Sequence, residues 1–133
     1  MNYPKQGDTF SFSRKFTRED ILDFAGISHD HGSHHVSGKR LIAHGLLVAT
    51  LPTKLGGDLN FIGSEMHFNF LKPVYEGETV TCTGKAEKIT SQSKRIKCLF
   101  SFVCHNEKNE CVLTGTSSGM IRKDDNQATD NEQ

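Results

Sequence analysis

The sequence predicts a single α+β domain in which an antiparallel sheet wraps around one central helix. Residues 43–55 carry apolar side chains at three- and four-residue spacings, as a helix requires. This helix is apolar nearly all round, so other elements must cover it. From residue 61 to residue 122 the pattern changes to a period of two, interrupted by short turns. A buried helix followed by consecutive strands indicates a sheet folded over that helix, with residues 1–123 as the domain.

The chain begins with a predicted strand and a predicted short helix. Asp8–Phe16 alternates apolar and polar residues. Thr17 is suited to cap a helix over Arg18–Ala25, since acidic residues follow it in the first turn. Gly26 is expected to end this helix. Its predicted core face holds Ile21, Leu22 and Phe24 or their neighbours.

The central helix is expected to run from about Ala43 to Leu55. Pro52 lacks a backbone N–H, so it predicts a kink, or a break near Leu51. The pair Gly56–Gly57 is expected to stop the helix.

The second half of the sequence predicts an antiparallel meander. After an alternating run that begins at Phe61, three further strands are separated by turn residues. They are expected over Thr79–Ile89, Lys94–Cys104 and Cys111–Arg122. The last ten residues, 124–133, include no core-forming side chain and are expected to be disordered.

Composition excludes several classes of function. Sixteen basic residues balance sixteen acidic ones, which gives no basic surface for nucleic acid or an anionic membrane. No apolar stretch is long enough to span a bilayer. The N-terminal residues include no apolar segment of the kind found in signal peptides. We therefore expect a cytoplasmic protein.

Four cysteines are present, and none of them forms a C-x-x-C pair. Cys98 and Cys104 share a period-two face with apolar residues, so they are interpreted as small core side chains. A zinc ribbon or a thioredoxin-like redox site is not indicated.

The stretch between the two predicted helices, Asp30-His31-Gly32-Ser33-His34-His35, offers three interpretations. It can be a solvated polar loop. It can be a metal site, although neither H-E-x-x-H nor a zinc-finger spacing is present, and no metal is expected. It can also be a carboxylate–imidazole pair that holds and activates a water molecule. His44, which starts the central helix, is interpreted as a residue that packs into the core.

Four segments in order resemble the MaoC-like dehydratase or (R)-specific enoyl-CoA hydratase family. The loop matches the family's D-x-N-P-x-H pattern at Asp30 and His35, and Ile42-Ala43-His44-Gly45-Leu46 matches its I-A-H-G-M/L helix start. The two other segments, Phe16–Ala25 and Phe68–Val80, match the family's first helix and its F-x-x-P-V-x-x-G-D-x-V strand and turn.

This resemblance implies a hotdog fold and an activity. It implies a lyase that hydrates 2-enoyl thioesters or dehydrates 3-hydroxyacyl thioesters carried by coenzyme A or acyl carrier protein, with no cofactor. Asp30 and His35 would hold the attacking water, and the Gly45 N–H would bind the thioester oxygen. Gly32 and His34 would line the substrate site, and His34 could replace His35 as the base. A homodimer is expected, since an antiparallel sheet leaves an edge strand to pair.

The sequence departs from the family pattern at three places. Gly32 and Ser33 stand where the family has Asn and Pro, and only eight residues, Val36–Ala43, separate His35 from His44. The missing length would normally cover the acyl tunnel. Two alternatives therefore remain: an acyl-CoA thioesterase, or a non-catalytic module that binds acyl thioesters. Lys39 and Arg40 would either meet the phosphates of coenzyme A or be solvated loop cations.

Overall fold

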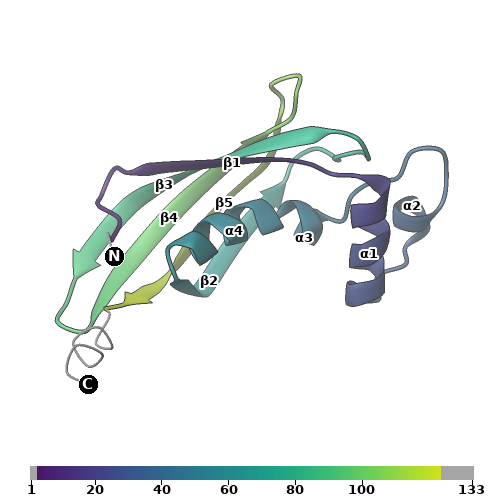
Figure 1. Cartoon of the computed structure of the whole chain (residues 1–133). Helices are drawn as coiled ribbons and strands as arrows, with labels where there is room; N and C mark the ends of the chain where they lie inside the picture. The colour runs from purple at the N-terminus through teal and green to yellow at the C-terminus, as the bar shows by residue number, and fades with distance from the viewer. Residues whose placement is uncertain (1–2, 124–133) are drawn as a thin grey trace.

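The computed structural model describes residues 3–123, and the tail expected to be disordered lies outside the described residues. Five strands form one antiparallel sheet in the order β1-β3-β4-β5-β2. Figure 1 shows this long curved sheet with the central helical segment along its concave side and two helices beyond one end. The α+β fold with a sheet around a central helix is confirmed. The strands are β1 (Thr9–Lys15), β2 (Phe61–Phe70), β3 (Thr79–Ser91), β4 (Arg95–His105) and β5 (Cys111–Arg122).

The strand order shows that the predicted meander contains three strands. Strands β3, β4 and β5 form the expected meander, but β2 pairs with β5 at the far edge instead of with β3. The connection from β2 to β3 therefore crosses the end of the sheet. Alternation along a strand fixes which face is buried, and it does not fix the neighbouring strand.

The core lies between the sheet and the central helical segment. Along β4, five alternate side chains are buried, because they face the helix. Cys98 and Cys104 belong to this set, which confirms their interpretation as core residues, and all four cysteines are free. The five are Ile96, Cys98, Phe100, Phe102 and Cys104.

Helix α1 (Arg18–Ser28) begins as predicted and ends later than predicted. Thr17 forms a capping box, with its hydroxyl accepting from the Asp20 N–H while the Asp20 carboxylate accepts from the Thr17 N–H. The helix continues through Gly26 and ends where His29 adopts a left-handed conformation. Ile21 is buried as expected, whereas Leu22 is exposed.

The central helical segment consists of α3 (Gly45–Val48) and α4 (Thr50–Asp58), interrupted at Ala49. The interruption was expected near Leu51. Pro52 lies instead in the first turn of α4, where a missing N–H leaves no hydrogen bond unmade. The prediction that Gly56–Gly57 stops the helix is wrong: α4 continues to Asp58, the Leu59 N–H donates back to the Gly56 and Gly57 carbonyls, and Asn60 then adopts a left-handed conformation.

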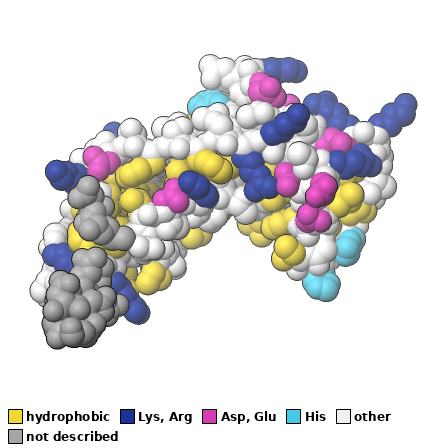
Figure 2. All heavy atoms as spheres, viewed as in Figure 1, with side chains coloured by type: hydrophobic (Ala, Val, Ile, Leu, Met, Phe, Trp, Pro, Cys, Tyr) yellow, Lys and Arg dark blue, Asp and Glu magenta, His cyan; other side chains and the backbone are white. Residues whose placement is uncertain are grey.

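Figure 2 shows one face of the molecule, on which hydrophobic side chains gather below β1 and around α1, and charged side chains are spread over the rest. Among the described residues, no helix is long and apolar enough to cross a membrane.

Candidate active site

Asp30 lies in a tight turn directly after α1. Its N–H donates to the Ser28 hydroxyl over 3.1 Å, and its Oδ1 accepts the Gly32 N–H over 3.1 Å. The second carboxylate oxygen, Oδ2, is left to face His35. Gly32, predicted to line the substrate site, therefore acts on the site through Asp30.

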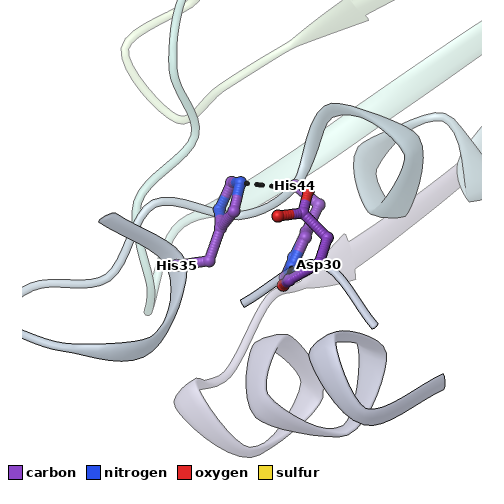
Figure 3. Close-up of side chains that lie close together, drawn as sticks. All are labelled: Asp30, His35 and His44. Carbon is purple, nitrogen blue, oxygen red and sulfur yellow. Dashed lines mark hydrogen bonds and ion pairs between the residues drawn. The ribbon is translucent and has the colours of Figure 1, made fainter. Parts of the chain in front are cut away.

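His34 and His35 lie on a one-turn helix, α2 (Ser33–Val36), and not in an irregular loop as predicted. The buried ring of His35 places Nδ1 2.7 Å from the Ile42 carbonyl oxygen. A carbonyl can only accept, so Nδ1 carries the proton in the neutral ring and Nε2 presents a lone pair. Nε2 lies 3.7 Å from Asp30 Oδ2 (Figure 3). The His34 ring lies beside the His35 ring, with their centroids 3.9 Å apart.

His44 is a member of this cluster that the sequence interpretation left outside the site. It is buried at the start of α3, as expected. Its ring also stacks on His35, with centroids 3.8 Å apart and planes 14° apart, and its Nε2 lies 3.0 Å from the Asp30 carbonyl oxygen. Nε2 therefore donates, and Nδ1 is left buried without a hydrogen-bond partner among the described residues. The His-Gly pair at a helix start was the sequence signal for this position.

Gly45 is the first residue of α3, where a backbone N–H has no acceptor within the helix. A Cβ at this position would lie 2.8 Å from the Phe70 ring. Only glycine therefore lets the Phe70 ring of β2 lie against the helix start, so close packing accounts for this glycine independently of any role in catalysis.

A short antiparallel contact supports the helix start. The Ala43 N–H donates to the Val74 carbonyl, and Ile42 bridges to Tyr75. Glu76 accepts hydrogen bonds from the Leu41 N–H and from the Arg18 side chain. Hydrogen bonds to Val74 and Glu76 thus hold the end of the eight-residue connection Val36–Ala43 in place. The F-x-x-P-V-like segment near Pro73 thus lies directly against the residues that precede α3.

The electrostatics of the cluster favour an ionised Asp30. The hydrogen bond from the Gly32 N–H lowers the pKa of Asp30, and nearby His35, His44 and His34 lower it further when charged. The carboxylate therefore accepts hydrogen bonds and does not donate them.

Arg40 was considered above as a residue that could meet the phosphates of coenzyme A. Its guanidinium lies 4.1 Å from the Tyr75 ring centroid and 3.7 Å from the Glu78 carboxylate.

A metal is poorly accommodated by these side chains. Asp30, His35 and His44 offer ligand atoms within 4.8 Å of one another. The two rings, however, are stacked nearly parallel, with planes 14° apart. Their remaining lone pairs lie in parallel planes and cannot both point at one ion at about 2.0–2.1 Å.

The cluster opens into a groove of about 670 Å³ between the α1–α2 region and the β2 edge. Four of the predicted site residues line it, namely Asp30, His34, His35 and Gly45. Phe70, Leu71 and Pro73 form part of the opposite wall. A carboxylate, an imidazole lone pair and a helix-start N–H therefore share one groove.

Comparisons with known proteins show what the chain as a whole is similar to. A family model described as "Thioesterase superfamily" matches residues 42–100. An (R)-specific enoyl-CoA hydratase of Rhodospirillum rubrum is 29% identical over 130 residues, covering 88% of each chain. A mitochondrial 3-hydroxyacyl-[acyl-carrier-protein] dehydratase of Arabidopsis thaliana is 26% identical over 121 residues, covering 82% of this chain and 72% of that protein.

The fold is shared with solved structures. The unliganded R-hydratase PhaJ1 of Pseudomonas aeruginosa superimposes with a TM-score of 0.78 at 18% identity, covering 90% of this chain and 82% of that one. The sheet and its central helix thus define a hotdog-fold protein. Within that class, the sequence similarity to the (R)-specific enoyl-CoA hydratase confirms the resemblance to the MaoC-like dehydratases.

Proposed function

We propose that the protein adds water to 2-enoyl thioesters and, in reverse, dehydrates 3-hydroxyacyl thioesters. The single observation that supports this most is the pairing of His35 and Asp30. The Nε2 lone pair of His35 and Asp30 Oδ2 lie 3.7 Å apart at the wall of an open groove. Two acceptors this close suit a water molecule that donates one hydrogen to each.

In this mechanism the water oxygen attacks C3 of the enoyl group. His35 Nε2 takes one proton from the water as the C3–O bond forms, and the Asp30 carboxylate orients the water through its other hydrogen. The imidazolium formed is stabilised by Asp30 and by the Nδ1–H bond to the Ile42 carbonyl. The same proton then passes to C2. General acid–base groups of this kind contribute about 10²–10⁴-fold in rate.

Negative charge develops on the thioester oxygen during the attack. The Gly45 N–H, at the groove wall and without a helical acceptor, is the donor we assign to that oxygen. A preorganised donor that meets the developing charge contributes about 10²–10³-fold.

Crotonyl-CoA hydration by four variants tests the proposal. Asp30→Asn and His35→Ala are each expected to lower kcat by about 10²–10⁴-fold with the fold retained. The matched controls are Asp23→Asn on α1 and His31→Ala in the loop, both at exposed positions, and both are expected to keep wild-type activity. Full activity in Asp30→Asn and His35→Ala would contradict the site.

A thioesterase is the second candidate, since the matching family model carries that name. That match begins at residue 42 and omits both Asp30 and His35, whereas the similarity to the hydratase spans most of the chain. We therefore favour hydration. Thiol release and hydration, measured on the same enoyl-CoA, separate the two reactions. Tight acyl-CoA binding with neither reaction would indicate a non-catalytic module.

We also propose a cytoplasmic homodimer that uses either coenzyme A or acyl carrier protein as the carrier. Strand β2 is at the sheet edge and exposes large apolar side chains, which a second copy would cover. Ile62, Met66 and Phe70 are all about half-exposed. Light scattering after size exclusion measures the mass, and a monomer at micromolar concentration would contradict the dimer.

A further inference from the structure

Two cysteines lie directly opposite each other in the core, on neighbouring strands. Cys82 of β3 and Cys104 of β4 are partners in the antiparallel register, and both side chains are fully buried. Opposed residues of an antiparallel pair have Cα atoms about 4.5–5.5 Å apart, within the range of roughly 4.4–6.8 Å that a disulfide spans. The backbone therefore already holds these two thiols at a separation that a disulfide can bridge.

The two thiols also interact with each other. The Cys104 S–H donates a hydrogen bond to the Cys82 sulfur, which lowers the pKa of Cys82 and raises the pKa of Cys104. Since the thiolate is the reactive form of a cysteine, this hydrogen bond favours Cys82 as the nucleophile of the pair. Cys98, also on β4, provides a contrast, because its register partners are Ile89 and Gly119 and burial raises its pKa to about 11.

A third thiol lies between this buried pair and the solvent. Cys111 begins β5 and is partly exposed. Its register partner is His105, and the register shifts between Cys104 and His105, at the residue pair next to the buried thiols. Cys111 is close enough for its charge to raise the pKa of Cys104. The three cysteines therefore lie on β3, β4 and β5, which run side by side (Figure 1), and lead from the core to a partly exposed position.

We propose that Cys82 and Cys104 form a reversible disulfide when the protein meets a hydroperoxide, and that Cys111 is the thiol that the oxidant reaches first. None of these cysteines lines the His35 groove, so this chemistry is independent of the proposed hydration. In the cytoplasm, which we propose as the location of this protein, disulfides are usually transient and redox-sensing.

The oxidation takes three steps. The Cys111 thiolate attacks one oxygen of the hydroperoxide, the O–O bond breaks, and a sulfenic acid forms on Cys111 as the other oxygen leaves in an alcohol or in water. The Cys104 sulfur then attacks the Cys111 sulfur, and the Cys104 proton leaves with the hydroxyl group as water. The Cys82 thiolate finally attacks the Cys104 sulfur and releases Cys111, which takes up the proton that Cys82 lost. In total, two thiols are oxidised to a disulfide and one hydroperoxide is reduced.

Peptide mapping after oxidation tests the proposal. The full chain is treated with hydrogen peroxide, its remaining thiols are blocked with N-ethylmaleimide under denaturing conditions, and mass spectrometry identifies the linked tryptic peptides. We expect a linkage between Cys82 and Cys104 that dithiothreitol reverses. The matched control is Cys98→Ala, which removes another buried cysteine of β4 and is expected to keep the linkage. This control also leaves Cys104 as the only cysteine in its tryptic peptide.

Three further variants test the order of the steps. Cys104→Ala is expected to form no disulfide. Cys82→Ala is expected to stop at the second step and to accumulate a linkage between Cys104 and Cys111. Cys111→Ala is expected to form the final disulfide about tenfold more slowly, because the peroxide then reaches the buried thiols only when the strands open locally. Circular dichroism confirms that each variant is folded before oxidation.

Each part of the proposal has its own contrary result. If neither the wild type nor folded Cys98→Ala links Cys82 to Cys104, the disulfide is overturned. An unchanged rate of oxidation in Cys111→Ala would overturn the role of Cys111 as the entry thiol. Because the readout is a peptide linkage, failure of crotonyl-CoA hydration would leave these outcomes unaffected.

Discussion

The two ends of the central helical segment differ in what surrounds them. At Gly45, the helix start meets a carboxylate and three imidazoles, and backbone groups hold one polar atom each of Asp30, His35 and His44. At Gly56, the helix meets aromatic rings and a single unpaired hydroxyl. The comparison teaches that the two ends of one helical segment have different structural requirements. The start of the segment depends on the positions of hydrogen-bonding groups. Its end depends on the space that glycines leave because they have no side chain.

Removal of His44 is the strongest way to disrupt the polar end. His44→Ala deletes the bond to the Asp30 carbonyl and the ring stacked on His35. The free energy of unfolding is expected to fall by about 1–3 kcal/mol. Crotonyl-CoA hydration is expected to fall as well, since Asp30 and His35 lose their support. Chemical denaturation and steady-state kinetics measure both.

The control for this prediction is His67→Ala on the exposed side of β2, which is expected to change stability by no more than about 0.5 kcal/mol. An unchanged stability in His44→Ala would mean that the stacked imidazoles do not support the site.

A pair of glycine substitutions contrasts the two ends directly. Gly45→Ala places a Cβ 2.8 Å from the Phe70 ring, so the ring must move away from the helix start. We expect lower stability and weaker turnover. Gly57→Ala meets nothing within 4 Å inside a helix, and it is expected to stabilise the protein by up to about 1 kcal/mol. Thermal unfolding measures the change in stability of each variant, and the two changes are expected to have opposite signs. A change of the same sign in both variants would contradict this contrast.

A smaller effect is expected from Ser33→Pro. Ser33 is the first residue of α2, where proline fits a helix start, and the preceding Gly32 has an extended ψ of 139° that proline tolerates. By reducing the freedom of the unfolded chain, this change is expected to raise the free energy of unfolding by about 0.4–1 kcal/mol. Urea denaturation measures the gain, and a loss would show that the turn does not accept a rigid residue.

The subtlest change removes one hydrogen bond from the Asp30 carboxylate. Gly32→Pro deletes the N–H that lowers the pKa of Asp30, while a φ of −50° suits proline. The pKa of Asp30 is expected to rise back towards its ordinary value, as NMR of the carboxyl carbon would show. Ser33→Pro keeps that N–H and serves as the control.

The sign of the pH effect follows from the direction of the shift. A pKa lowered by folding adds stability above the pKa of the unfolded chain, and that contribution is lost as pH falls through the folded value. Gly32→Pro is therefore expected to reduce the dependence of stability on pH in the acidic range. An unchanged titration of Asp30 would mean that the Gly32 N–H does not hold the carboxylate.

Much of the site was predictable from the sequence because its members are close together in the chain. Asp30 and His35 were identified from one loop, and Gly45 from the helix start that follows. His44 was interpreted only as a core residue, since stacking on His35 depends on how α2 and α3 approach each other. A cavity beside Ser117, between α4 and the sheet, could not be predicted, because its walls come from α4 and all five strands.

The sequence by itself determined the α+β class and the limits of most strands, and it singled out Asp30 and His35 as a candidate carboxylate–imidazole pair. Local periodicity, capping and loop spacing carry that information within a few residues. Only the tertiary structure decided that β2 pairs with β5, that the helix passes through Gly56 and Gly57, and that His44 joins the site. The physical reason is that these features depend on packing between segments far apart in the chain, which can override local propensity.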